Sequence, residues 1–583
     1  MSDPTRVVRA ARWLAPVIVM LAGVAAAAAP AVSNLKAAYR SGQVFLTWNE
    51  QDVPDDTTFN VYLSDAPLSA ASLVGAALVG HHVEKHSATD WWSDPAAFGN
   101  AASGSARGFV IEDEGTPLNP RSGLFVHTVT DDNPDRMHFA VTTTAADGTE
   151  DRAVSAGANA TTQPVRGAVE LPRPVRLRDA PDAGAGAGKP LVLRLHGRGA
   201  DGNGAPGGAN FVMYGTPKHG WRQGLARRFT VYGNPDRIEI DPWDRMWVGR
   251  SLASSGDRRD AGKAINTWWY GGNNKIYDPT AVGTGVVVNY TERYLLWLVA
   301  WAQDHYGTDP AMTGIEGFSM GGTGAISMGF HHPETFSYIL ARVPQPVYGE
   351  REGFYGMKSI DRLNGLAGGI AADATLMSDE GVPVVERMDA ARIAAEYPGE
   401  LPYLVVVNGR KDESMPWANN PPFYEALSAG RRGFMAYWND GGHDMYKNLP
   451  ADVEGQLNRL PAFATDRAYP AFSNFSADGD PGNGAVSSGD AEGGINRGLG
   501  WSDVQDTAAG FGVTVTADGA VVRLPARVDV TPRRLTGFVV APGSSVRATV
   551  DGHARTVRAD ANGLVTIEGV ELTGAPVRIE LAR

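Results

Sequence analysis

The sequence predicts a multidomain protein in which a central α/β domain, a mostly parallel sheet with helices on both faces, is flanked by two β-rich domains. The chain has 583 residues, enough to form several separate hydrophobic cores. Between about residues 165 and 466, short apolar runs alternate with helical patterns, as in a parallel sheet. On both sides of this stretch, short strand patterns and turns rich in Gly, Pro and Asp take over. We therefore expect domains at residues 32–164, 165–466 and 467–583.

The first 31 residues have the pattern of a secretory signal peptide. Three arginines precede an apolar run from Trp13 to about Ala29, and the run ends in the small residues Ala29-Pro-Ala31. An uncleaved membrane anchor is the alternative, but the run is short for a spanning helix and rich in alanine, which favours cleavage. We expect a secreted or periplasmic protein whose mature form does not span a membrane.

Charge and composition exclude several kinds of partner and site. The net charge of −13, without a long basic run, argues against nucleic acid as a partner. The lack of cysteine excludes disulfides, thiolate metal sites and a cysteine nucleophile. Asp478, Asp480 and Asn483 hint at calcium, but they lack the loop pattern of a calcium site, and a solvated turn is favoured. We expect neither a metal nor a cofactor.

The N-terminal β-rich segment contains four strand patterns, the first of which ends in alternating apolar residues at Trp48. They cover residues 43–48, 59–63, 124–129 and 139–143, and the turn Asp147-Gly148 follows. This arrangement resembles a fibronectin type III module with residues 66–120 as an insertion. The resemblance implies a spacer or docking surface. Trp91 and Trp92 could stack on a sugar ring, but packing is the favoured interpretation.

The C-terminal segment is turn-rich at first and then contains five further strand patterns. These are residues 513–515, 521–524, 536–540, 546–550 and 577–581. The pattern predicts a β-sandwich accessory domain with a role in binding or stabilisation.

A possible nucleophile turn lies in the central domain. The apolar residues up to Glu316 predict a strand, and a helix pattern follows the motif Gly317-Phe-Ser319-Met-Gly321. So tight a turn forces Ser319 into a strained conformation with an exposed hydroxyl. The N–H of Met320, at the start of the helix, would face negative charge beside that hydroxyl. A glycine-rich turn that happens to hold a serine is the alternative.

Two further strand patterns end in candidate partners for this serine. The apolar run 404–407 leads into Asp412, and the run 434–438 leads into His443. Serine needs a base with a pKa near 7, and that base needs a carboxylate to orient it. Glu413 is an alternative to Asp412 as the orienting carboxylate. Asp440 and Asp444 flank His443, but carboxylates so near in sequence rarely have the right approach to the ring.

Other sequence patterns of the central domain bear on this site. The strand pattern 190–195 ends in His196-Gly-Arg198-Gly199, a glycine turn suited to supplying a second oxyanion donor, and we assign that role to Arg198. Residues 289–305 predict a helix with Thr291 as a possible cap. We expect His331-His332 to be structural or solvated. Residues 207–285 predict an aromatic-rich loop insertion, within which Gly249-Arg-Ser-Leu-Ala253 is a poor second nucleophile turn.

Three motifs together resemble the secreted α/β-hydrolase serine esterases, including the esterase D and polyhydroxyalkanoate depolymerase-like group. They are Gly317-Phe-Ser-Met-Gly-Gly322, Gly409-Arg-Lys-Asp412 and Asp440-Gly-Gly-His443. The resemblance implies an α/β-hydrolase fold over residues 165–466. It also implies Ser319 as nucleophile, His443 as general base and acid, Asp412 as orienting carboxylate, and Met320 and Arg198 as oxyanion donors.

The expected function is hydrolysis of a carboxylic ester, small or polymeric, through an acyl-enzyme. Serine peptidases of the prolyl oligopeptidase type share the same pattern, and an acyltransferase would pass the acyl group to an alcohol instead of water. A non-enzymatic surface-binding protein, built on the two β-rich domains, is the alternative of a different class. The motifs leave open the oligomeric state and the acyl and alcohol parts of the substrate.

Overall fold

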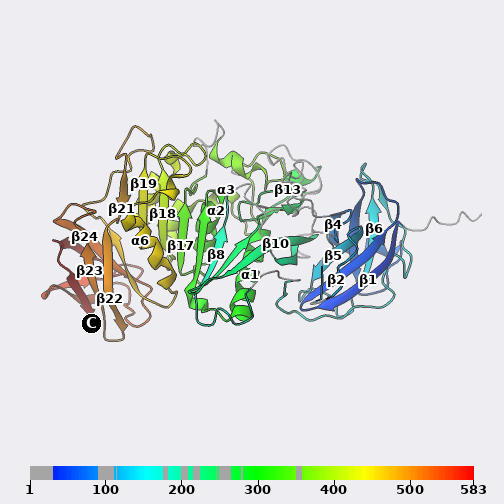
Figure 1. Ribbon diagram of the computed structural model, residues 1–583, viewed down its shortest axis with the longest axis horizontal. Coiled ribbons are helices and arrows are strands. Elements are labelled where there is room, and N and C mark those ends of the chain that lie inside the picture. Colours follow the sequence, from blue (N-terminus) through cyan, green and yellow to red (C-terminus); the bar gives the residue numbers. More distant parts are fainter. Residues whose placement is uncertain are drawn as a thin grey trace, which may run out of the picture.

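Three parts follow one another along the long axis of the molecule in chain order (Figure 1). The computed structural model describes residues 31–88, 110–112, 115–174, 181–197, 208–214, 223–244, 246–247, 264–276, 280–348, 358–373 and 375–583. Apart from Ala31, the predicted signal peptide lies outside these residues, as do Trp91, Trp92 and the Gly249–Ala253 motif. Within the described ranges, no helix has the length and apolarity needed to cross a membrane.

The N-terminal part consists of two antiparallel sheets that bury a shared core. One sheet has the order β1-β2-β5 and the other β4-β3-β6-β7. Trp48, Phe59, Phe125 and Phe139 are buried together between them. The strands are β1 (Val32–Arg40), β2 (Gln43–Glu50), β3 (Thr58–Ser64), β4 (Ala77–Glu84), β5 (Ser122–Thr128), β6 (His138–Thr144) and β7 (Glu150–Asp151).

Residues 66–120, predicted to be an insertion, contribute β4 to the second of these sheets. The prediction is therefore wrong for β4. Val79 and Val83 of that strand are buried in the shared core, and the strand pairs with β3 through two register shifts that interrupt its alternation. The identification as a fibronectin type III module and the limits 32–164 stay predictions.

The central part is built on a sheet of nine described strands in the order β21-β19-β18-β17-β16-β8-β11-β10-β9. The strands from β19 to β11 run parallel, β21 and β10 run in the opposite direction, and β9 pairs antiparallel with β10. Their bounds are β8 (Leu191–Leu195), β9 (Gly208–Tyr214), β10 (Gln223–Gly233), β11 (Ile238–Pro242), β16 (Thr313–Phe318), β17 (Tyr338–Arg342), β18 (Tyr403–Gly409), β19 (Phe434–Asn439) and β21 (Gly493–Ile495). Two short pairs lie apart from it: β12 (Met246–Trp247) with β13 (Ala264–Ile265), and β14 (Gly272–Asn273) with β15 (Val287–Val288).

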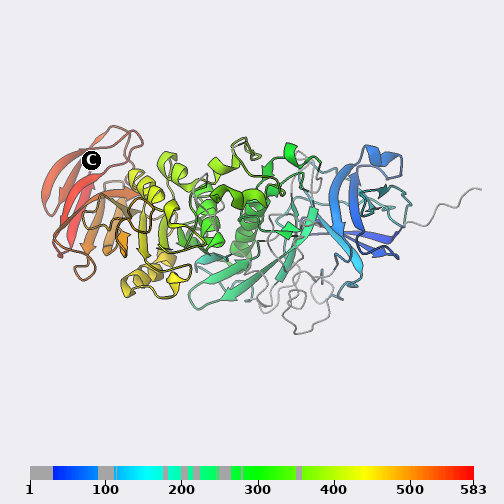
Figure 2. The ribbon, with the colours of Figure 1, turned by 90° about the horizontal axis from the view of Figure 1, so that it is seen from above.

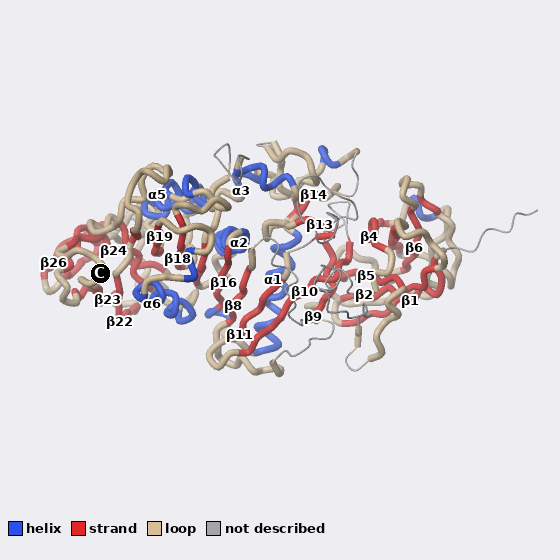
Figure 3. The backbone as a smooth tube through the Cα atoms, turned by 45° about the horizontal axis from the view of Figure 1, so that its top comes forward, coloured by secondary structure: helices blue, strands red, loops and turns tan. Residues whose placement is uncertain are grey.

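Helices cover both faces of this sheet (Figures 2 and 3). One core joins alternate strand residues such as Ile315 and Ile339 to four helices, which are α1 (Tyr290–Tyr306), α2 (Met320–His331), α4 (Ala390–Glu396) and α5 (Pro421–Ala429). On the other face, Leu340 and Val405 pack with Val453 of α6 (Ala451–Arg459). Because neighbouring strand residues point to opposite faces, the continuous apolar runs of the sequence bury both sides.

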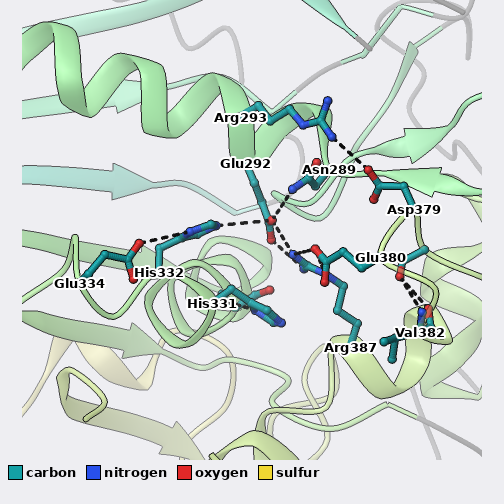
Figure 4. A network of polar contacts seen from close by, with 12 residues as sticks. Asn289, Glu292, Arg293, His331, His332, Glu334, Asp379, Glu380, Val382 and Arg387 are labelled. Atoms are coloured by element: carbon teal, nitrogen blue, oxygen red, sulfur yellow. Dashed lines mark hydrogen bonds and ion pairs between the residues drawn. The ribbon is translucent and has the colours of Figure 1, made fainter. Parts of the chain in front are cut away.

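A buried polar network ties the start of α1 to the end of α2 and to α3 (Val384–Arg387), as Figure 4 shows. Arg387 donates to both carboxylate oxygens of Glu292, at 2.9 and 2.8 Å. His332 lies 3.7 Å from the same carboxylate, and His331 bonds the main chain of Ser327 at 2.8 Å. The structure thus places both histidines at the end of α2 that is remote from Ser319.

The predicted cap of α1 is wrong. Asn289 occupies the N-cap position, and Thr291 lies inside the helix. The hydroxyl of Thr291 lies 2.7 Å from that of Thr267, which Asp244 also binds. The Thr291 side chain therefore makes a tertiary contact and does not cap the helix.

The C-terminal part contains two sheets around a third core. Their orders are β20-β24-β27 and β22-β23-β28-β25-β26, and Phe472, Phe511, Val530 and Ile579 are among the buried residues. The strands are β20 (Tyr469–Ser473), β22 (Leu499–Thr507), β23 (Gly510–Ala517), β24 (Ala526–Arg533), β25 (Ser545–Val550), β26 (His553–Arg558), β27 (Ile567–Leu572) and β28 (Val577–Ala582).

Two strand predictions in this part are wrong. Residues 521–524 form a turn, because the N–H groups of Val521 and Val522 both donate to the carbonyl oxygen of Asp518. Residues 536–540 also lie outside the strands, and the N–H groups of residues 536–538 donate to the Asp506 carboxylate. In both segments these N–H groups are satisfied without a strand ladder.

Candidate active site

The chain turns sharply between β16 and α2, at Ser319. The strand continues to Phe318, two residues beyond the predicted end, and Ser319 has φ 58° and ψ −121°. A Cβ on Gly317 would lie 2.0 Å from the carbonyl oxygen of Gly321, and a Cβ on Gly321 would lie 2.0 Å from that of Leu195. Only glycine fits at these two positions, so the motif spacing follows from the backbone packing.

The start of α2 provides one candidate oxyanion donor. The N–H of Ser319 donates to the carbonyl oxygen of Arg342 at 2.8 Å and is therefore occupied. Met320 is the first residue of α2, so its N–H has no carbonyl of the preceding turn to bind. Gly197 lies alongside, since a Cβ placed on it would be 3.2 Å from Cβ of Ser319. Arg198, the predicted second donor, lies outside the described residues.

The candidate acid and base meet beyond the carboxyl ends of β18 and β19. Asp412 Oδ2 lies 2.7 Å from His443 Nδ1. The other oxygen, Oδ1, accepts the N–H groups of Ser414 and Met415 at 2.7 and 2.9 Å. The Asp412 side chain is 1% exposed, whereas that of His443 is 31% exposed. The carboxylate is therefore fixed, and it orients a ring that can still be reached from outside.

The rival carboxylates lie elsewhere. Glu413 is exposed. Asp440 pairs with Lys411 at 2.9 Å and with Arg410 at 3.4 Å. Asp444 pairs with Lys447 at 3.7 Å. Of the candidate acids, Asp412 is the one that the structure brings to the His443 ring.

Phe318 connects the nucleophile turn to the histidine loop, a role that the sequence pattern did not predict. Its ring centroid lies 5.0 Å from that of His443 and 4.7 Å from that of Tyr446. Within the described residues, the Ser319 hydroxyl forms no hydrogen bond with the His443 ring. Such catalytic bonds often shorten only when substrate binds. Phe318 occupies a variable position of G-x-S-x-G, so the motif itself carries no signal for it.

An open cleft of about 870 Å³ adjoins this site, and Gly197, Phe318 and Tyr446 form part of its wall. The floor of the cleft is formed by charged side chains of β8, β11 and β16. Arg194 lies 3.0 Å from Glu239, and Arg342 lies 3.3 Å from Glu316. The approach to the candidate active site from this side is polar.

The residues that hinted at calcium accept main-chain N–H groups. Asp478 Oδ1 accepts the N–H of Asn496 at 2.6 Å, Asp480 Oδ1 that of Gly482 at 2.8 Å, and Asn483 Oδ1 that of Ala485 at 3.0 Å. Burial raises the pKa of Asp478 to about 7. Across the described ranges, no three His, Cys, Asp or Glu side chains are grouped so that they could hold a metal ion.

Comparison with known proteins finds an esterase family match over part of this site. Residues 256–429, which include Ser319 and Asp412, match the family described as "Putative esterase". An S-formylglutathione hydrolase from Agrobacterium tumefaciens is a structural neighbour with 15% identity and a TM-score of 0.32, over 48% of this chain and 86% of its own. A fluorophosphonate-binding serine hydrolase from Staphylococcus aureus has 13% identity and a TM-score of 0.28, over 47% and 84%. No curated protein matches the sequence.

A ferulic acid esterase is a further structural neighbour, with 14% identity and a TM-score of 0.26 over 48% of this chain and 85% of its own. The family match spans the nucleophile turn and the acid turn and includes β16, β17 and β18 of the parallel sheet. The protein is a carboxylic ester hydrolase.

Proposed function

We propose that the protein is a secreted serine hydrolase that cleaves carboxylic esters through an acyl-enzyme formed on Ser319. One observation carries the proposal: the 2.7 Å contact between Asp412 and His443. It joins two loops that follow adjacent parallel strands, β18 and β19. Phe318, the immediate neighbour of Ser319, packs against the same His443 ring. A nucleophile, a base and an orienting carboxylate are the minimum set for this chemistry.

In the first half of the reaction, Ser319 Oγ attacks the ester carbonyl carbon while His443 Nε2 takes the hydroxyl proton. The carbonyl oxygen becomes an oxyanion and accepts the N–H of Met320, with Arg198 as the proposed second donor. His443 then gives the proton to the leaving alkoxide oxygen as the C–O bond breaks. The alcohol departs, and the acyl group stays on Ser319.

In the second half, water attacks the acyl carbon and His443 takes a proton from it. The tetrahedral intermediate collapses, the bond to Ser319 Oγ breaks, and the proton returns to that oxygen. The products are a carboxylic acid and free enzyme. Asp412 keeps Nδ1 of His443 protonated, so that Nε2 faces the reaction as the base.

Labelling with a fluorophosphonate tests the proposal. We expect one adduct, on Ser319, in the folded protein and none in Ser319→Ala. Chromogenic esters should be hydrolysed, and matched peptide substrates should not. Cleavage of peptides instead would favour the peptidase, and acyl transfer to an added alcohol in preference to water would favour the transferase. A folded protein without an adduct on Ser319 would contradict the proposal.

Export is part of the proposal and has its own test. The support is the basic start, apolar centre and small-residue end of residues 1–31. N-terminal sequencing of the protein from a native-type host should find a chain that begins at about residue 32 outside the cytoplasm. Recovery of the full-length chain in the membrane fraction would show an anchor instead. The strand order β1-β2-β5 and β4-β3-β6-β7 supports a fibronectin-like module as the N-terminal part of the proposed enzyme.

A further inference from the structure

Arg410 lies between the turn that carries Asp412 and the loop that carries His443. It directly follows β18, and its side chain is 3% exposed. Its main-chain N–H donates to the carbonyl oxygen of Asn439 at 2.8 Å, and the N–H of Lys411 donates to that of Gly441 at 3.0 Å. Two backbone hydrogen bonds, from Arg410 and from Lys411, therefore join the acid turn to the histidine loop.

The guanidinium group of Arg410 contacts two separate parts of the chain. Nη1 lies 3.4 Å from Oδ1 of Asp440, three residues before His443. Nη2 donates to the carbonyl oxygen of Val486 and, at 2.7 Å, to that of Ser488. A planar fork of donors can make these contacts at once, whereas a lysine ammonium cannot. Arg410 thus links the histidine loop to a segment whose contacting residues, Val486 and Ser488, follow His443 by more than forty residues in sequence.

That segment, residues 478–492, is anchored without Arg410. Its continuation β21 pairs with β19. Trp438 Nε1 donates to the carbonyl oxygen of Asp490 at 3.0 Å, and Trp417 Nε1 donates to that of Pro481 at 3.3 Å. The main chains of residues 480 and 490 are also bonded, at 2.8 Å. The carbonyl groups that accept from Arg410 therefore belong to a loop with fixed attachments to the central sheet.

We propose that Arg410 is a positioning residue that sets the separation of the acid turn and the histidine loop by bonding Asp440 and the anchored segment 478–492 together. This inference rests on the proposed function, because the distance it controls is the one between Asp412 and His443. A small displacement of a catalytic group lowers the rate without removing the substrate contacts. The segment assigned from sequence to an accessory domain then acts as a support for the catalytic site.

Arg410→Lys is the first test, in the full mature chain with a chromogenic ester. The substitution keeps the positive charge and removes the fork. We expect kcat to fall about 10- to 100-fold while KM changes less than about twofold, because orientation is lost and not ground-state binding.

Asp440→Asn provides a second variant at a half-exposed position, where folding is not at risk. It removes the charge of Asp440 and leaves Arg410 bonded to the anchored segment. Its effect on kcat should be smaller than that of Arg410→Lys. The double variant should have the same kcat as Arg410→Lys, since the Arg410–Asp440 contact that Asp440→Asn removes is already lost in Arg410→Lys.

A proton spectrum gives a readout that does not depend on turnover. The proton shared by His443 Nδ1 and Asp412 should appear downfield of the amide protons and should be missing in His443→Gln. We expect this resonance to broaden or disappear in Arg410→Lys, although both of its partners are intact.

Arg432→Lys is the matched control, at the opposite end of β19 from His443. Arg432 is also buried, and it donates to the carbonyl oxygens of Ala394 and Gly399, each at 2.8 Å. Its replacement should lower Tm and leave both kcat and the downfield resonance unchanged. Loss of kcat in both lysine variants to the same degree would show a general stability effect and would overturn the inference.

The inference and the proposed function fail in different ways. Wild-type kcat and an unchanged resonance in Arg410→Lys would overturn the inference while Ser319 still forms its adduct. If Arg410→Lys does not fold, wild-type kcat in Asp440→Asn would overturn it in the same way. A wild-type protein that shows the resonance but forms no adduct on Ser319 would defeat the proposed function. The resonance of Arg410→Lys would still decide the role of Arg410.

Discussion

Two charged contacts in the central part of the molecule use similar groups in different ways. The pair Glu292–Arg387 is closed: its side chains are 0% and 3% exposed, and both carboxylate oxygens accept from the same guanidinium. The pair Asp412–His443 is half open, because the carboxylate is buried and the ring is 31% exposed. A closed pair can only hold elements together, whereas a half-open pair presents a ring nitrogen to a substrate. Exposure of the ring is what would allow the Asp412–His443 pair to take part in the proposed reaction.

The largest expected effect comes from removing the ring of the half-open pair. His443→Gln should lower kcat by up to about 10⁶-fold, the magnitude seen when a member of a serine triad is lost. Because the ring is partly exposed, urea unfolding should change little. Steady-state hydrolysis of a chromogenic ester measures the rate, and a variant with more than a tenth of wild-type kcat would show that His443 is not the base.

Breaking the closed pair should have the opposite signature. Glu292→Gln leaves the Arg387 charge buried without its full partner, which should cost about 3–5 kcal/mol in the free energy of unfolding. Ester hydrolysis by the folded fraction should stay near the wild-type rate, since Glu292, at the start of α1, contacts the end of α2 that is remote from Ser319. Equilibrium urea unfolding measures the loss, with the exposed residue Glu334 changed to Gln as the control. An equal loss of unfolding free energy in Glu334→Gln would show that the destabilisation is not specific to the closed pair.

The closed pair also predicts a pH dependence of stability. Burial alone would raise the pKa of Glu292, but the Arg387 guanidinium lowers it from 4.5 to about 2. The unfolded chain therefore takes up the proton first, so this contribution is complete above about pH 4.5 and is lost as the pH falls toward 2. The difference in unfolding free energy between wild type and Glu292→Gln should shrink over that range. A difference independent of pH would show that Glu292 is not ionised in the folded protein.

The smallest effect is expected at the exposed edge of the half-open site. Lys411 pairs with Asp440 at 2.9 Å, but its side chain is 58% exposed. Surface ion pairs of this kind often contribute nothing measurable. Lys411→Met should therefore change neither Tm nor kcat, in contrast to its buried neighbour Arg410. A clear loss of kcat would assign the positioning of the loop to both cations.

Local patterns in the sequence located much of the central domain, but the prediction of a loop insertion at residues 207–285 is wrong for β9, β10 and β11, which belong to the central sheet. The predicted helix 289–305 corresponds to α1, and the run 404–407 lies within β18, because both patterns depend on residues that are neighbours in the chain. The turn at Ser319 was also readable, since its two glycines are required by contacts within a few residues and with the adjacent strand. Asp412 and His443 each follow a strand pattern, in the order after Ser319 that the resemblance to α/β-hydrolases implies, and together with the Ser319 motif this predicted the candidate site.

Only the tertiary structure decided which side chains meet. Asp412 and Glu413 are neighbours with the same chemistry, and the direction of the turn after β18 puts one against His443 and leaves the other exposed. The three residues of β21 carry too short a pattern to predict a strand, yet they close the edge of the central sheet beside β19. Strand pairing and burial depend on partners far away in sequence. The sequence therefore determined the chemistry available to this protein, and the packing of distant segments decided how that chemistry is arranged.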